Sequence, residues 1–188
     1  ATALSIARQG DHQAVSSLLE AAEGLATLLS TAEVEDASPL LPKLLAAGVL
    51  SIAALAALSA EDLQSQYGLA TPQAEGLAAK AKAAALLQAA TDGDEASVRA
   101  LIEAGADIEA TDQQGWTPLV RASSKGHEAC VLTLVKAGAN VNAAKEDGWT
   151  ALLHSCSLGH ETVAQELLAA GAAVDTQLPS GHTALILS

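Results

Sequence analysis

The residues best suited to covalent chemistry are His154, Ser155 and Cys156, which follow one another directly along the chain. A histidine that takes the proton of a thiol can turn that thiol into a nucleophile. Close neighbours on a helix point in different directions, so His154 and Cys156 would not face each other if this stretch is helical. The sequence therefore predicts that the chain is not an enzyme and has no catalytic residues.

Other reactive side chains carry no clearer chemistry. For the two cysteines, Cys130 and Cys156, we favour reduced, packed thiols over a disulfide or a reactive site. No His/Cys spacing indicates zinc, and the glycines do not form a phosphate-binding loop after a strand. We therefore expect no metal and no cofactor.

Two stretches of the chain are nearly the same, QGWTPLVRASSKGH at residues 114–127 and DGWTALLHSCSLGH at residues 147–160. The offset that separates Trp116 from Trp149 also separates the Gly, Thr, Leu and His residues around them. A fixed period of about 33 residues predicts stacked repeats, because one helix pair cannot bury its own apolar face.

Each repeat is predicted to hold two short helices. Thr117 can cap the first helix, and Pro118 suits its first turn. Gly126 allows a tight turn into a second helix, where Val131 and Leu134 stand at helical spacing. The elements that position the candidate side chains are therefore antiparallel helix pairs joined by longer hairpin loops.

This pattern resembles the ankyrin repeat, whose sequence is roughly D-x-x-G-x-T-P-L-H-x-A-A-x-x-G-H, then V-x-x-L-L-x-x-G-A-D-V-N. The resemblance covers residues 83–188, divided into repeats at 83–111, 112–144, 145–176 and a partial repeat at 177–188. LSIARQGDHQAVSSLLEAAE predicts a further ankyrin-like helix pair at residues 1–24. The resemblance implies an all-α solenoid that binds proteins. It also implies that His127 and His160 are structural and bond to neighbouring backbone.

A second module is expected at about residues 28–82. The order LLAAGVLSIAALAALSAEDLQSQYGLATPQAEGLAAKAKA resembles a sterile alpha motif (SAM) domain, a small helical bundle. This resemblance implies oligomerisation or assembly through the module. A helix-hairpin-helix module that grips nucleic acid has a similar pattern, but only Lys80 and Lys82 lie near it, so we favour the SAM-like interpretation. Ser59 should cap one helix, and Thr71 should begin a last helix that reaches Lys82.

The chain is acidic, with a formal net charge of −13. Such a chain is not drawn to phosphate backbones or anionic membranes, so we expect no nucleic-acid partner and a protein partner with a basic patch. The most apolar stretch, residues 39–58, is interrupted by Lys43 and is too short to span a bilayer, so we expect no membrane insertion. We expect a cytoplasmic location. Because the chain does not begin with Met and looks like part of a longer or processed protein, an organelle interior after removal of a transit peptide is the alternative.

Side chains that vary between repeats project from the hairpin tips and first helices. The ankyrin resemblance implies that this surface, here called the ledge, holds partner proteins. The predicted partner-binding residues of the ledge are Gln113, Gln114, Trp116, Arg121, Lys125, Lys145, Glu146, Trp149, His154, Leu158, Gln177 and His182. For the two tryptophans, two interpretations stay open, namely packing against the neighbouring hairpin and a binding hot spot.

These features together predict a non-catalytic adaptor or scaffold, such as an accessory subunit of a larger assembly. Two alternatives are a nucleic-acid-associated protein built on the helix-hairpin-helix pattern and a regulatory segment of a larger enzyme.

Overall fold

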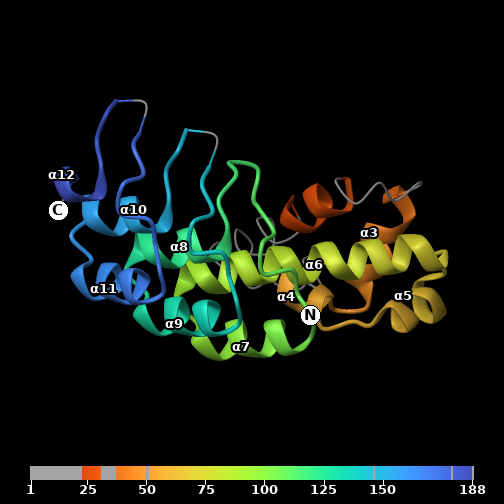
Figure 1. The fold of residues 1–188 in the computed structure, drawn as a ribbon. Coiled ribbons are helices and arrows are strands. Elements are labelled where there is room, and N and C mark those ends of the chain that lie inside the picture. The colour runs from red at the N-terminus through yellow and green to blue at the C-terminus, as the bar shows by residue number, and fades with distance from the viewer. Residues whose placement is uncertain (1–22, 31–36, 50, 146, 179, 188) are drawn as a thin grey trace, which may run out of the picture. The chain divides into compact units, whose positions relative to one another are not determined.

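The computed structural model describes residues 23–30, 37–49, 51–145, 147–178 and 180–187 (Figure 1). The chain divides into two compact units, Ala1–Ala85 and Leu86–Ser188. Within the described ranges the secondary structure is helical, and the only β pairing among them is an isolated bridge between Ala144 and Thr150. The helix pair predicted at residues 1–24 lies almost wholly outside the described residues.

Unit 1 is built from small helices. Residues 23–30 are helical, and they are followed by α3 (Ala37–Ala46), α4 (Ile52–Ala56), α5 (Ala60–Tyr67) and the first part of α6 (Thr71–Asp92). The interior is formed by fully buried leucines, which are Leu25, Leu29, Leu44, Leu55, Leu63 and Leu77. Burial of one such side chain contributes roughly 1.5–3 kcal/mol.

The start of α5 matches its sequence prediction. The Ser59 hydroxyl accepts the Asp62 N–H at 3.0 Å, and the Asp62 carboxylate accepts the Ser59 N–H at 3.0 Å. This reciprocal pair satisfies two backbone donors that a helix start leaves without partners. The helix ends at Gly68, whose φ of 74° lies in the left-handed region that glycine adopts without strain.

The end of α6 differs from its sequence prediction. The helix expected to stop at Lys82 continues without a break to Asp92, over 22 residues. Residues 77–92 contain no glycine or proline, and most of them are Ala, Leu, Lys or Gln, which are strong helix formers. Nothing in this stretch ends a helix until Gly93. The predicted end at Lys82 is therefore wrong, and the predicted boundary between residues 82 and 83 falls inside α6.

Unit 2 arranges its helices in two rows. After the last part of α6 come α7 (Glu95–Glu103), α8 (Pro118–Lys125), α9 (Glu128–Lys136), α10 (Ala151–Ser157), α11 (Glu161–Ala169) and α12 (Ala184–Leu187). In Figure 1, α8 and α10 lie in one row, α7, α9 and α11 lie in the other, and the hairpin loops project on the side of α8 and α10. Five fully buried leucines join the rows, namely Leu119, Leu134, Leu152, Leu153 and Leu167.

The residues predicted to begin and end the helices of the repeats are confirmed. The Thr117 hydroxyl accepts the Val120 N–H, and the Thr150 hydroxyl accepts the Leu153 N–H, each at 3.3 Å. Gly126 ends α8 in the left-handed region with a φ of 75°. These local signals set where α8 and α10 begin and hence how their side chains face the hairpins.

Histidines connect one repeat with the repeat before it. His127 Nε2 lies 3.0 Å from the Thr91 carbonyl oxygen, and His160 Nε2 lies 3.2 Å from the Ser124 carbonyl oxygen. In both pairs the ring N–H donates to a carbonyl at the end of the preceding first helix. The structural role implied for His127 and His160 is confirmed.

A second connection joins the loops that follow α7, α9 and α11, here called the outer helices. The Glu109 carboxylate accepts the Asn140 N–H at 2.7 Å, and the Asn142 side-chain oxygen accepts the Ala173 N–H at 2.8 Å. Glu109 and Asn142 are equivalent positions of successive repeats. The repeats are therefore held in register by polar bonds as well as by apolar packing.

Candidate functional site

A series of ring contacts runs across two repeats on the ledge. The His154 ring lies between two indoles, with its centroid 4.5 Å from that of Trp116 and 4.6 Å from that of Trp149. The ring planes are inclined by 32° for the Trp116 pair, which is tilted, and by 29° for the Trp149 pair, which is stacked. We call Trp116, His154 and Trp149 the aromatic stack.

Arg121 extends the aromatic stack at its Trp116 end, and both residues belong to the repeat at residues 112–144. Its guanidinium carbon lies 4.6 Å from the centroid of the Trp116 ring, within the range of a cation–π contact. Arg121 and His154 are equivalent positions of successive repeats, on α8 and α10. Arg121 and His154 therefore project from matching positions of α8 and α10, and each contacts the tryptophan of its own repeat.

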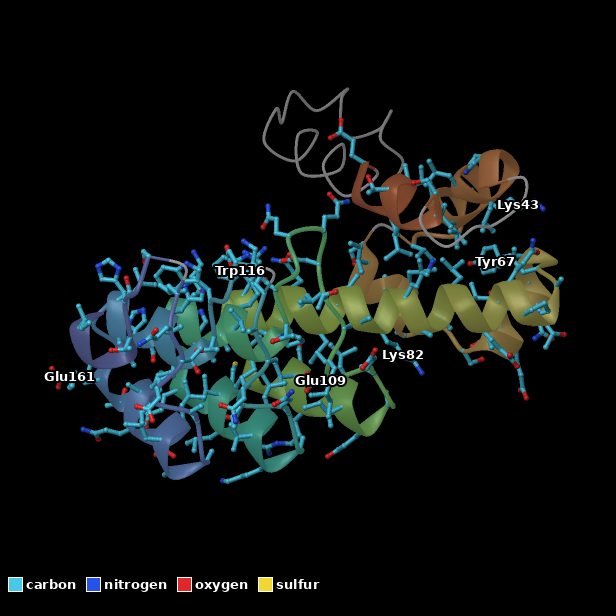
Figure 2. All side chains as sticks on the ribbon, turned by 45° about the horizontal axis from the view of Figure 1, so that its top comes forward. Lys43, Tyr67, Lys82, Glu109, Trp116 and Glu161 are labelled. Atoms are coloured by element: carbon cyan, nitrogen blue, oxygen red, sulfur yellow. The ribbon has the colours of Figure 1, made fainter. Side chains whose placement is uncertain are left out.

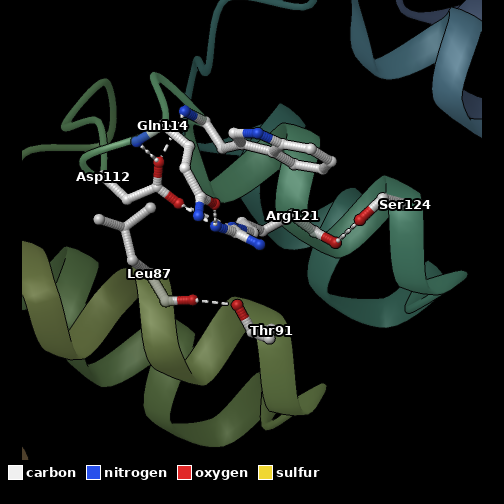
Figure 3. Close-up of polar contacts among 7 residues, drawn as sticks. Leu87, Thr91, Asp112, Gln114, Arg121 and Ser124 are labelled. Atoms are coloured by element: carbon white, nitrogen blue, oxygen red, sulfur yellow. Dashed lines mark hydrogen bonds and ion pairs between the residues drawn. The ribbon is translucent and has the colours of Figure 1, made fainter.

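A network of polar contacts fixes Arg121. Its Nε donates to Asp112 Oδ2 at 2.8 Å, a second bond joins its Nη2 to the same oxygen, and Nη2 also donates to Gln114 Oε1 at 2.7 Å. Figure 3 shows the guanidinium of Arg121 directed at both Asp112 and Gln114. Bonds between guanidinium and carboxylate are charge-assisted and hold the cation in one orientation.

The other Asp112 oxygen shapes the hairpin. Asp112 Oδ1 accepts the backbone N–H of Gln114 at 2.8 Å and of Trp116 at 3.0 Å. Burial alone raises the pKa of Asp112, but these N–H bonds and the bonds from Arg121 outweigh it and hold the pKa below its ordinary value. Asp112 therefore positions both Trp116 and Arg121, and it is half-buried and charged.

The next repeat places its charges differently. Lys145 stands where the preceding repeat has Asp112, and Asp147 stands where it has Gln114. Lys145 Nζ lies 2.8 Å from Asp147 Oδ2, so this ion pair is contained within the hairpin. The bond from Lys145 lowers the pKa of Asp147. The α10 position equivalent to Arg121 is His154, whose ring forms no hydrogen bond to a carboxylate among the described residues.

His154 is half-buried, and one of its nitrogens has no hydrogen-bond partner among the described residues. That atom is Nε2, which is shielded from solvent. Burial lowers the pKa of His154, the charge of Lys145 lowers it further, and the charge of Asp147 acts in the opposite direction. The ring between the indoles is therefore neutral at pH 7.

The structure brings half of the predicted ledge residues together. Gln114, Trp116, Arg121, Lys145, Trp149 and His154 share the contacts described above. Figure 2 shows Trp116 on the side of the hairpin loops. The remaining described members are exposed and take no part in those contacts, and they are Gln113, Lys125, Leu158, Gln177 and His182. Glu146 lies outside the described residues.

Sequence reasoning missed Asp112, which organises the first hairpin of the ledge. A signal was present, because Asp112 stands three residues before Gly115 and matches the leading D of the D-x-x-G-x-T pattern. The open question about the tryptophans is answered in part, since both rings pack within the chain. Their faces against His154 are covered, while both residues keep some exposed surface.

The described residues include two thiols and other side chains of the kinds that ligate metals. Among the described residues, no group of three His, Cys, Asp or Glu side chains could hold a metal ion. Cys130 is buried, Cys156 is half-buried, and neither forms a disulfide. Burial raises the pKa of both thiols, which disfavours the reactive thiolate. What the arrangement provides is a stiff surface of rings and paired charges.

The helices of the described part of the chain are short or polar by the standard of a membrane span. None of them combines the length and the hydropathy that a bilayer span requires.

Comparison with protein families agrees with this architecture. A profile for ankyrin repeats in three copies matches residues 50–145, and a profile for a single ankyrin repeat matches residues 147–177. The first match begins inside the stretch with the SAM-like pattern, and the SAM-like module stays a prediction. No curated protein sequence matches the chain significantly. On its helix pairs, its hairpins and these two matches, the chain belongs to the ankyrin repeat family, whose repeats are protein–protein interaction modules.

Proposed function

We propose that this chain is a non-catalytic adaptor that binds a protein partner along the ledge. The observation that carries the proposal is the position of His154 between Trp116 and Trp149. The stack and the Asp112–Arg121 pair hold side chains of two repeats in one arrangement before any partner arrives. Preorganisation of this kind lowers the entropy that binding must otherwise overcome.

Exposed members of the ledge lie close in sequence to this fixed centre. Gln113, Gln114 and Lys125 are exposed next to the half-buried Trp116 and Arg121. A centre of Trp and Arg with a polar rim is the usual composition of a protein-binding hot spot. The indole edges and the rim, rather than the stacked ring faces, are the surfaces that a partner would touch.

Charge supports a partner with a basic patch. The net charge of −13 attracts such a surface at long range, and added salt should slow the association. The ledge itself pairs its charges as Arg121 with Asp112 and Lys145 with Asp147. Long-range attraction would therefore set the rate of encounter, and the ledge would select the partner.

Unit 1 has a separate role in this proposal. We infer that the SAM-like pattern at residues 28–82 contributes self-association or assembly, supported by the resemblance of its sequence and by its bundle of small helices. Light scattering over a range of protein concentrations tests this part. A mass that stays monomeric at the highest concentration contradicts it.

Site-specific cross-linking tests the ledge. A photoreactive amino acid is placed at Gln114 or Lys125 on the ledge, and at Glu128 or Glu161 on the outer helices as matched exposed controls. Cross-linked partners from the source cells are identified by mass spectrometry. We expect the same partner from both ledge positions and not from the controls. Capture at the outer helices alone contradicts the proposal.

A surface-charge swap supplies the second arm of the experiment. Lys125→Glu changes an exposed residue on the ledge, and Lys136→Glu makes the same change on an outer helix. Neither residue belongs to the buried core, so both variants should fold. A changed affinity for the partner with Lys125→Glu and an unchanged affinity with Lys136→Glu support binding at the ledge, and the reverse result assigns it to the outer helices.

A further inference from the structure

We propose that His154 makes the ledge responsive to pH, because protonation drives its ring out of the space between Trp116 and Trp149. The aromatic stack is then closed when His154 is neutral and open when it is charged. This regulation concerns the same surface as the proposed function, and its consequence for partner binding rests on that function. The opening itself is a property of the chain alone.

Hydrogen bonding supplies the first argument. A charged imidazole carries an N–H on both nitrogens, and each N–H needs an acceptor or water. Nε2 of His154 is shielded from solvent and has no hydrogen-bond partner among the described residues. A proton on this atom would leave a charged donor buried without an acceptor, which is among the most unfavourable arrangements in a folded protein. Rotation of the ring into water removes this cost.

Nearby charges supply the second argument. The charged groups that act on His154 are Lys145 and Asp147 from its own hairpin. Arg121 of the preceding repeat, paired with Asp112, lies over the Trp116 ring that His154 also contacts. Each of the two carboxylates is already bonded to one of the two cations. A charged His154 would therefore be a third cation beside two carboxylates that already have partners.

Two attractions act in the opposite direction. A cation between two indoles gains cation–π energy, and the charge of Asp147 favours protonation. Against them stand the burial of the ring, which lowers the pKa of His154 in spite of Asp147, and the missing acceptor at the shielded Nε2. The balance therefore favours leaving the stack over charging within it.

Position 154 is also one where the repeats differ. Arg121 is permanently charged at the equivalent position of the preceding repeat, but there Asp112 accepts two of its bonds. The repeat of His154 lacks that carboxylate, because Lys145 occupies the corresponding site. A cation is therefore stabilised at position 121 on α8, whereas a cation at position 154 on α10 would have no such carboxylate partner.

The two tryptophans report on the stack directly, because both tryptophans of the chain belong to it. Their emission is recorded on the full chain without any partner from about pH 7.5 to about pH 5, the range in which histidines titrate. Far-UV circular dichroism is recorded on the same samples. We expect the emission maximum to move to longer wavelength with a midpoint below the ordinary histidine pKa of about 6.5, while the helical signal stays constant.

Variants isolate the responsible histidine. His154→Gln and His154→Leu should abolish the wavelength shift, and leucine is the residue at position 187, one repeat further along the sequence. His182→Gln, at an exposed position outside the stack, should keep it. Because the other histidines remain in each His154 variant, a flat profile assigns the response to His154.

Three results would overturn the inference. One is an emission maximum that does not move across the pH range. A fall in emission intensity without such a shift counts as this result, because it reports a charged ring that stays between the indoles. Another is a shift that coincides with loss of the helical signal, since that reports global unfolding. The third is a shift that persists in both His154 variants. None of these results bears on whether the ledge binds a partner, which the cross-linking experiment decides.

Discussion

His160 lies against the bare Cα of Gly126, one repeat earlier in the chain. A Cβ built on Gly126 would be 2.7 Å from Nδ1 of His160, a distance that non-bonded atoms do not tolerate. Gly93 and His127 repeat this relationship at 2.6 Å. The glycine at the end of a first helix therefore serves two purposes, because it adopts the left-handed conformation and also admits the histidine of the next repeat.

Gly126→Ala should destabilise the chain more than Gly159→Ala. The two glycines have nearly equal φ values of +75° and +73°, but nothing lies within 4 Å of a Cβ at Gly159. The left-handed conformation alone costs alanine about 1–2 kcal/mol. At Gly126 the methyl group must also displace His160 from its bond to Ser124, for a total of roughly 2–4 kcal/mol. Urea unfolding measures both free energies, and equal losses would contradict the steric argument.

Asp112→Ala should destabilise unit 2 by about 1–3 kcal/mol, because it removes a charged partner of Arg121 and two acceptors of the hairpin backbone. Gln113→Ala, at the adjacent exposed position, should stay within about 0.5 kcal/mol. The free energy of unfolding in urea gives the comparison. A loss as small for Asp112→Ala as for Gln113→Ala would show that the network adds nothing to stability.

Asp112 should also contribute to acid unfolding. Its pKa is lower in the folded chain than its ordinary value of 3.8. The unfolded chain therefore binds the proton more readily, so this stabilisation is complete well above pH 3.8 and is lost as the pH falls through the folded pKa. Asp112→Asn should be less stable than wild type near neutral pH and lose less stability between about pH 5 and pH 2. Parallel stability curves for the two proteins would contradict this assignment.

Glu109→Ala should weaken the junction between repeats, while Glu109→Gln should not. Glu109 accepts the Asn140 N–H at 2.7 Å, and a glutamine side-chain oxygen can accept the same bond. The expected loss for alanine is about 0.5–1.5 kcal/mol. Asn142→Ala removes the equivalent bond to Ala173 and should behave like Glu109→Ala. Equal losses for the alanine and glutamine variants at position 109 would exclude this bond as the cause.

The two thiols should react at different rates in the folded chain. Cys130 is fully buried and Cys156 is half-buried, so a thiol reagent should modify Cys156 first. Modification of Cys130 should wait for local or global opening and slow down as stability rises. Cys156→Ser should keep only the slow phase. Retention of only the fast phase in that variant would place Cys130 closer to solvent than the structure does.

Ala84→Pro should be strongly destabilising because residue 84 lies inside the continuous α6. Proline in a helix interior costs about 3 kcal/mol or more, and glycine at the same position costs about 1 kcal/mol relative to alanine. If the helix ended at Lys82, as the sequence pattern suggested, proline at residue 84 would be tolerated. Thermal unfolding of Ala84→Pro beside Ala84→Gly distinguishes the two cases, since proline should lower the midpoint far more than glycine.

Much of the fold could be predicted from local patterns. The regular spacing of matching residues identified the repeats, Thr117 and Ser59 marked helix starts, and Gly126 marked a helix end. Helix starts and ends depend on residues close together in the chain, where backbone conformation and capping bonds are determined by residue type. The end of α6 could not be predicted in the same way, because the pattern of two familiar modules suggested a boundary where helix propensity allows none.

The sequence by itself determined which residues of each repeat reach the ledge, since equivalent positions of stacked units face the same side. Only the tertiary structure decided how they meet. Trp116 and His154 belong to different repeats, and their contact depends on the distance between repeats and on the side-chain torsions of both. The same holds for Arg121, which could have faced solvent but bonds Asp112. Repeat patterns specify register, whereas ring stacking and charge pairing depend on distances that a pattern does not contain.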